Sequence, residues 1–199
     1  MLSSSAPTSE SLGSSARRER RERILDATIA LASHGGFDAV QMRAVADRAD
    51  VALGTLYRYF PSKIHLLVAA LAREFERTES ALGASRIEGD TPADRVVTVL
   101  RWTTSGLEDD PHLTEALTRA FMFADRSVAT EIRLVARLLT RIVTNAMHPD
   151  RDEVDDEDVA IARVVGDVWL ASLVGCVTGR STTAEAVAHM ERAVRLIVR

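Results

Sequence analysis

The sequence predicts an all-α protein of about nine helices. Apolar residues recur with the period of amphipathic helices, and proline and capping residues mark successive helix starts. No alternating β-branched runs between turn signals indicate strands. With 199 residues, 46% of them hydrophobic and 27% charged, the chain is long enough for one sizeable core, or for two small cores that share an interface.

The first predicted helix follows a polar, Ser-rich start. Residues 1–15 contain few bulky apolar side chains and are expected to form a disordered tail. From Ala16 the pattern becomes helical, and between Ile24 and Leu31 the apolar positions follow the i, i+3, i+4, i+7 spacing. The glycines of the sequence HGGF are expected to end this helix.

Two short helices and one long helix are expected next. The short ones cover about Gln41–Ala49 and Ala52–Tyr59, and Asp50 lies in the tight turn between them, where a short polar side chain tolerates left-handed backbone. Ser62, after Pro61, is the expected N-cap of the long helix, which reaches about Leu82. The composition changes within this long helix, which predicts that it is shared by a small N-terminal and a larger C-terminal domain.

The remaining helices are predicted mainly from their start signals. A capping residue followed by proline opens two of them, and an acidic stretch at residues 150–158 precedes a helix that is apolar around most of its circumference. A capping box opens the last helix. The expected starts are Thr91–Pro92, Asp110–Pro111, Asp125 (with an end before Pro149), Asp156 (for a helix to about Val177) and Thr182, whose box is completed by Glu185.

Charge is distributed unevenly along the chain. Residues 1–63 contain nine Arg and Lys against seven Asp and Glu, whereas residues 64–199 contain sixteen against twenty-two. A basic N-terminal part on an acidic body indicates that only the former meets a polyanion. The run Arg17–Arg23 has five arginines and two glutamates, which suits either a salt-bridged helix face or contact with a DNA backbone or minor groove.

The two short helices have the helix-turn-helix arrangement, in which the second helix enters the DNA major groove. Val51 is the apolar residue expected to fix the corner. The leading turn of the second helix is small or short, so it can approach the groove floor closely, and it consists of Ala52, Leu53, Gly54 and Thr55. The expectation is that these residues contact base edges.

Phenols and cations follow this leading turn, where phosphates would flank the groove. The expected phosphate contacts are Tyr57, Arg58, Tyr59 and Lys63. The alternative is that the cluster Tyr57, Tyr59 and Phe60 is core, and we expect Tyr59 and Phe60 to be partly so. Arg43 is either a solvated surface charge or a further DNA contact.

The run Gly36 to Leu67, GFDAVQMRAVADRADVALGTLYRYFPSKIHLL, resembles the DNA-binding signature of TetR-family transcriptional regulators. The resemblance implies a homodimeric repressor on a palindromic double-stranded DNA operator. Residues 16–63 would be the helix-turn-helix DNA-binding domain, and residues 64–199 the ligand-binding and dimerisation domain. The sequence departs from the family pattern at Gln41, a weaker helix cap, at Asp50, and at Ala52–Leu53, where apolar residues would shift readout toward DNA shape.

Within that family, the Arg-rich start, the turn and the body are similar to regulators of steroid (cholesterol) catabolism. The resemblance implies control of lipid or steroid catabolism genes and a small hydrophobic inducer, such as a steroid CoA thioester or another acyl-CoA-type metabolite. A transcriptional activator of the same family and a helical protein-interaction module remain as alternatives. The motifs of an enzyme, such as HExxH, GxSxG or a phosphate-binding glycine loop, do not occur, and no cofactor or metal is expected.

The predicted C-terminal domain supplies candidates for two further sites. Apolar side chains and one carboxylate are together candidates for lining an apolar ligand pocket, although ordinary core is the better interpretation for any single apolar one and the carboxylate could equally lie on the surface. They are Trp102, Phe121, Met122, Phe123, Asp167 and Trp169. Small and apolar residues of the last two helices are candidates for a four-helix dimer interface; they are Gly166, Gly175, Ala186, Met190, Ala193 and Ile197.

The chain carries no expected membrane or secretory signal. No uninterrupted apolar run reaches the ~18–20 residues that span a bilayer, and the N-terminus lacks an apolar signal-peptide core. Cys176 is the only cysteine, so no internal disulfide can form, and we expect a buried, inert thiol. These features predict a cytoplasmic protein without a membrane partner.

Overall fold

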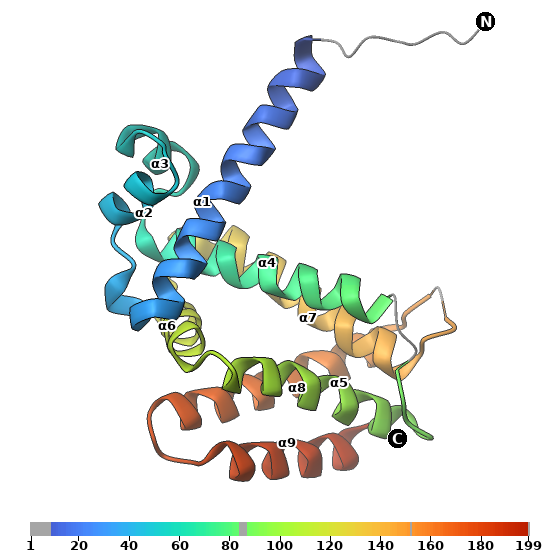
Figure 1. Ribbon diagram of the computed structural model, residues 1–199. Coiled ribbons are helices and arrows are strands. Elements are labelled where there is room, and N and C mark those ends of the chain that lie inside the picture. Colours follow the sequence, from blue (N-terminus) through green and yellow to red (C-terminus); the bar gives the residue numbers. More distant parts are fainter. Residues whose placement is uncertain (1–8, 84–86, 152, 199) are drawn as a thin grey trace, which may run out of the picture.

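The computed structural model describes residues 9–83, 87–151 and 153–198. In this part of the chain helices joined by loops are the regular elements, and there are no strands (Figure 1). The all-α prediction is therefore confirmed. The elements are α1 (Ser9–Ala39), α2 (Met42–Arg48), α3 (Leu53–Tyr59), α4 (Lys63–Gly83), α5 (Pro92–Glu108), α6 (Pro111–Met122), the 3-10 helix η1 (Arg126–Val128), α7 (Ala129–Met147), α8 (Asp156–Val177) and α9 (Thr183–Ile197).

Helices α1 to α3 form the N-terminal domain. Helix α1 begins at Ser9, seven residues before the predicted start at Ala16, so the predicted tail is shorter; residues 1–8 lie outside the described part. The predicted end is confirmed, because Gly35 and Gly36 have non-helical backbone angles and separate a last short helical segment. Figure 1 shows α2 and α3 beside the lower part of α1, away from α8 and α9.

Helix α4 joins the N-terminal domain to the body formed by α5–α9. Its first two turns are buried almost continuously, from His65 to Ala70, because α1, α6 and α7 all pack against it. Ser62 caps it loosely, because its Oγ accepts a hydrogen bond from the His65 backbone N–H at 3.4 Å. The long helix predicted from the change in composition is thus present, and it packs against both α1 and the body.

The predicted helix starts in the body are confirmed by their caps. The Asp110 side chain accepts a hydrogen bond from the Leu113 N–H, and Thr182 and Glu185 form a reciprocal capping box. One start differs, because Asp125 caps the short 3-10 helix η1, and α7 begins only at Ala129. With this exception, the helices begin where the capping residues in the sequence predict.

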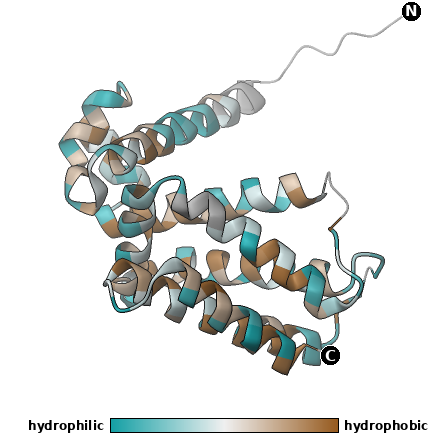
Figure 2. Cartoon of the chain, turned by 60° about the horizontal axis from the view of Figure 1, so that its bottom comes forward, coloured by the Kyte–Doolittle hydropathy of each residue, from teal (hydrophilic) through white to brown (hydrophobic). Residues whose placement is uncertain are grey.

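Helix α8 is the most apolar helix of the body. By length and composition alone it could cross a membrane, contrary to the expectation from the sequence, but it packs against α6, α7 and α9. Only 28% of its most apolar 18-residue window is buried. In Figure 2 hydrophobic residues gather on the helices of the body. A substantial part of the apolar surface of α8 is thus left uncovered by the chain itself.

Candidate nucleic-acid interface and ligand cavity

The leading turn of α3 is open to solvent. Ala52, Leu53 and Gly54 are exposed, and a Cβ added at Gly54 would meet no atom within 4 Å. Thr55 is half-buried. The helix-turn-helix interpretation requires this surface to be reachable by a duplex, and the structure satisfies that requirement.

The turn before α3 has the geometry that the sequence predicted. Asp50 has a φ of 51°, the one positive value at a non-glycine residue in the described chain. The Val51 N–H donates to the Ala46 carbonyl oxygen, and buried Leu56 holds α3 against the other helices. Gln41 precedes α2 without a side-chain cap bond, as expected.

The aromatic cluster divides between surface and core. Tyr57 is 46% exposed and Arg58 is exposed, so both are available to a phosphate backbone. Phe60 is buried and Tyr59 is half-buried. Tyr59 and Phe60 are thus partly core, as expected, whereas the contacts of Tyr57, Arg58 and Tyr59 with phosphate stay predictions.

Arginines of α1 lie beside this cluster. The guanidinium carbon of Arg17 is 5.9 Å from the centroid of the Tyr59 ring. A hollow of about 360 Å³ is lined by Ala16, Arg17, Arg20, Arg58 and Tyr59. The arginine-rich run is thus placed on the same side as α3, which favours DNA contact over a purely salt-bridged helix face.

Arg43 is exposed on α2. Lys63, in contrast, lies against another part of the protein. The Lys63 Nζ is 3.8 Å from the centroid of the Phe37 ring, at the junction with the body. Burial lowers the pKa of Lys63, and the Asp38 carboxylate acts in the opposite direction. Its ammonium group is engaged within the protein, so its contact with phosphate stays a prediction.

The body contains several hollows, of which two are neighbours and mostly apolar. The larger of these two has a volume of about 520 Å³ and lies between α5, α6, α8 and α9. The smaller, of about 160 Å³, lies between α4, α6, α7 and α8. Thr114, Trp169 and Leu173 line both, and the Trp169 Nε1–H donates to Thr104 Oγ1 at 3.4 Å. The buried indole thus separates two mostly apolar spaces.

The predicted ligand residues are only partly at these cavities. Trp169 lines both, and Phe121 and Asp167 line the smaller. Trp102, Met122 and Phe123 line neither of these two cavities and are 49%, 50% and 61% exposed, so their contact with a ligand stays a prediction.

The sequence did not predict the polar residues of the cavity walls. Thr104, Thr114 and Glu115 line the larger cavity. The signal in the sequence that could have indicated them is a polar residue on a helix face that is otherwise expected to be buried. Cys176 also lines this cavity and is half-buried, so it is less buried than expected.

The predicted dimer residues mostly face the chain's own core. A Cβ at Gly166 would lie 2.8 Å from Leu139 Cδ2 of α7, so this glycine accommodates a helix of the same chain. Ala186 and Met190 are buried and line the larger cavity. The side chain of Ser181 fills the space beside buried Gly175.

An exposed apolar surface lies on other faces of the same two helices. Ala193 and Ile197, from the predicted set, are only half-buried. Val164 of α8 is 47% exposed and Leu196 of α9 is 76% exposed. If α8 and α9 form an interface, these outward residues fit it better than the predicted buried ones.

Comparison with known proteins covers nearly the whole chain. Residues 24–70 match the family described as bacterial regulatory proteins, tetR family, and residues 89–197 match the family described as tetracyclin repressor-like, C-terminal domain. The first range contains α2 and α3 together with parts of α1 and α4, and the second contains the helices of the body.

Individual relatives support the same assignment. The HTH-type transcriptional repressor KstR of Rhodococcus jostii is 52% identical over 189 residues, 95% of this chain and 87% of that protein. The crystal structure of a TetR transcriptional regulator from Rhodococcus sp. RHA1 has a TM-score of 0.84 at 33% identity, covering 92% and 97% of the two chains. Thermus thermophilus FadR, solved with lauroyl-CoA, shares the fold at a TM-score of 0.66 and 20% identity, covering 89% and 92%.

Proposed function

The chain belongs to the TetR family of transcriptional regulators, and from this membership we propose that it represses genes of lipid or steroid catabolism as a homodimer on a palindromic operator. It is a DNA-binding regulator and not an enzyme. The observation that carries the proposal is the open leading turn of α3, whose Gly54 has free space where a side chain would stand. Such a protein acts on the chromosome, in the cytoplasm.

DNA recognition would use the two kinds of contact that α3 offers. Ala52, Leu53 and Gly54 let the helix lie close to the groove floor, where apolar contact with thymine methyl groups and DNA shape carry readout. Tyr57 and Arg58, both exposed, would hold the phosphates and fix the register. Two copies related by a two-fold axis would then read the half-sites of a palindrome.

The cavities support a small hydrophobic inducer. A volume of about 520 Å³ lies within the roughly 300–1,000 Å³ typical of ligand pockets. Its lining is mostly apolar, with a few hydroxyls and one carboxylate. We propose that it takes the steroid or acyl part of a CoA thioester; the lauroyl-CoA complex of a distant relative shows that the fold can hold such a group.

The decisive experiment measures operator binding as a function of salt and ligand. An operator selected from random duplexes is titrated with the full chain by fluorescence anisotropy. Arg58→Ala and Tyr57→Phe should each weaken binding, and Arg58→Ala should lower the salt slope by about one unit for a lost phosphate contact. Arg137→Ala, which removes an exposed arginine of α7, is the matched control and should change neither quantity.

The ligand arm uses the CoA thioester of a cholestenoic acid, with lauroyl-CoA and free cholesterol as comparators. A repressor of this type should lose operator affinity when the steroid thioester is added. Failure of the selection to yield an operator would contradict the proposed regulator, and a selected operator whose affinity no thioester changes would contradict the inducer.

A further inference from the structure

Glu115 of α6 belongs both to the wall of the larger cavity and to the joint with the N-terminal domain. It is one of the residues that line that cavity. Its Oε2 accepts a hydrogen bond from the Phe37 backbone N–H at 2.8 Å, across 78 positions of sequence. A single residue therefore lies both at the place where a ligand would bind and at the end of α1.

The backbone at this joint is built to receive a carboxylate. Gly36 has a φ of 67°, in the left-handed region that favours glycine, and a Cβ there would lie 2.7 Å from Glu115 Oε2. The non-helical angles of Gly35 and Gly36 place Phe37 at the start of a short helical segment, where backbone N–H groups commonly lack a carbonyl partner in the helix. Glu115 satisfies one of them from another helix.

Arg119, one turn further along α6, holds the other carboxylate oxygen. Its Nη1 lies 3.2 Å from Glu115 Oε1 and 3.4 Å from Asp38 Oδ2. The hydrogen bond to Glu115 is the main reason that the pKa of Arg119 is raised. Its guanidinium also lies over Phe37, 4.6 Å from the ring centroid. Residues of α1, α4 and α6 thus meet at Phe37, since Lys63 contacts the same ring.

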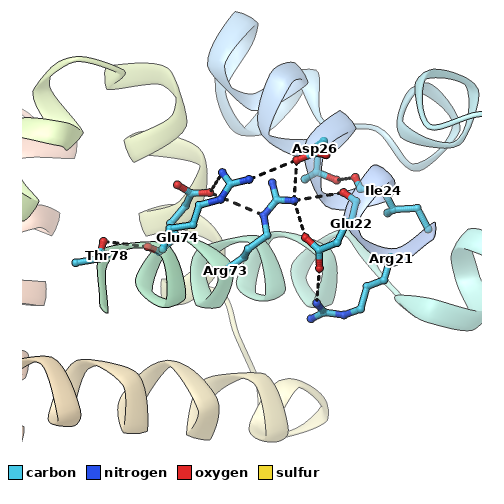
Figure 3. Close-up of polar contacts among 9 residues, drawn as sticks. Arg21, Glu22, Ile24, Asp26, Arg73, Glu74 and Thr78 are labelled. Carbon is cyan, nitrogen blue, oxygen red and sulfur yellow. Dashed lines mark hydrogen bonds and ion pairs between the residues drawn. The ribbon is translucent and has the colours of Figure 1, made fainter. Parts of the chain in front are cut away.

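A second tie between α1 and the rest of the protein is out of reach of the cavities. Figure 3 shows Arg73 of α4 directed at Glu22 and Asp26 of α1, and these residues line neither described cavity. Of the polar groups that the structure shows bonding to α1 from other helices, Glu115 is the one that also lines the larger cavity. A ligand can therefore act directly on one tie and leave the other intact.

We propose that Glu115 couples the larger cavity to the DNA-binding domain, a proposal that rests on the function proposed above. A ligand that draws or displaces the Glu115 carboxylate removes the acceptor of the Phe37 N–H. The end of α1 is then released from α6, and the population shifts toward arrangements of the N-terminal domain that fit the operator less well. By linkage, operator binding weakens ligand binding by the same factor.

The test is the coupling ratio, defined as the operator dissociation constant at saturating ligand divided by that without ligand. For the wild-type chain, with the CoA thioester of a cholestenoic acid, we expect a ratio of about 5 to 150. Glu115→Ala should bind the operator about as weakly as the ligand-saturated wild type, with a ratio near one. Because the ratio is measured at saturation, a changed ligand affinity does not affect it.

Two further variants control the result. Glu115→Gln keeps an oxygen that can accept from Phe37, so it should retain more coupling than Glu115→Ala. Glu79→Ala removes the carboxylate that pairs with Arg141 at 2.7 Å between α4 and α7, away from α1 and the larger cavity, and should keep the wild-type ratio. An unchanged ratio in Glu115→Ala beside a responsive wild type would refute the coupling role alone, whereas an unresponsive wild type would refute the proposed induction.

Hydrogen exchange provides a measurement on the wild-type chain itself. The amide of Phe37 should exchange more slowly in the free protein than in the protein saturated with the same thioester. If the ligand weakens operator binding but leaves the hydrogen-exchange rates of segment 33–41 unchanged, the proposal is overturned. This readout does not depend on whether a variant folds.

Discussion

At the scale of the residue, Arg73 shows how the fold handles a buried charge. Its side chain is 5% exposed, and its Nη1 donates to Asp26 Oδ1 at 2.8 Å and to Glu22 at 3.3 Å (Figure 3). The Nε and Nη2 atoms have no hydrogen-bond partner within the described residues. A buried guanidinium is costly unless it is paired, so the two carboxylates of α1 keep this charge in place.

Removing those carboxylates should cost more stability than removing the arginine. Combining Glu22→Gln with Asp26→Asn leaves the buried cation only the more distant Glu74 carboxylate, 4.0 Å from its Nε, and because both carboxylates of α1 are partly solvated the expected loss is about 1–3 kcal/mol. Arg73→Met removes charge and desolvation cost together and should be nearer neutral. Urea unfolding measures both, with Asp47→Asn on the exposed face of α2 as the control. The opposite order of stability would contradict this account of the buried pair.

At the scale of the element, helix starts are fixed by side chains within three residues. In the capping box of α9 the Glu185 carboxylate accepts from the Thr182 N–H at 2.8 Å, and the Glu185 N–H donates back to Thr182 Oγ1 at 3.2 Å. The hydrogen bonds from Thr182 hold the pKa of Glu185 below its ordinary value of 4.5. The folded chain therefore favours the ionised form of Glu185 more strongly than the unfolded chain does.

The lowered pKa of Glu185 predicts a pH-dependent contribution to stability. Because the folded value is depressed, this contribution is present above pH 4.5 and is lost as the pH falls through the folded pKa. Glu185→Gln retains a side chain suited to the capping box but cannot ionise. Its melting temperature should be below that of the wild type at pH 7, and the difference should shrink as the pH falls below 4.5 and through the folded pKa. A difference that does not change with pH would show that the charge is not its origin.

At the scale of the whole molecule, the uncovered apolar surface of α8 and α9 needs a partner. Val164 and Leu196 are exposed, and less than a third of the most apolar window of α8 is buried. Solvent-exposed apolar surface of this kind marks interaction sites. A second copy packed by two-fold symmetry would cover it and would also place two N-terminal domains for successive half-sites.

A charge on this surface should separate the subunits. Leu196→Glu and Val164→Glu should each shift the chain from dimer to monomer in light scattering after size exclusion, and should weaken operator binding by more than tenfold, since one half-site then binds alone. Val154→Glu is the matched control, because Val154 is 41% exposed in the loop before α8. A variant that stays dimeric with unchanged operator affinity would place the interface elsewhere.

The sequence by itself determined what depends on near neighbours in the chain. The caps at Asp110 and Thr182 were predictable because donor and acceptor lie within three residues. The left-handed turn at Asp50 and the exposed start of α3 followed from residue types in a short motif. The helical class and the turn before α3 therefore needed no knowledge of distant contacts.

Only the tertiary structure decided which helix faces turn inward and against what. Periodicity showed that α8 and α9 were apolar, but the packing of α7 against Gly166 and the burial of Met190 turned the predicted dimer face into core. Trp102 faces outward, and Glu115 reaches Phe37, because neighbours far away in sequence fill or leave the space beside them. Hydrophobic burial is non-directional, so a pattern specifies that a face is covered but not which surface covers it.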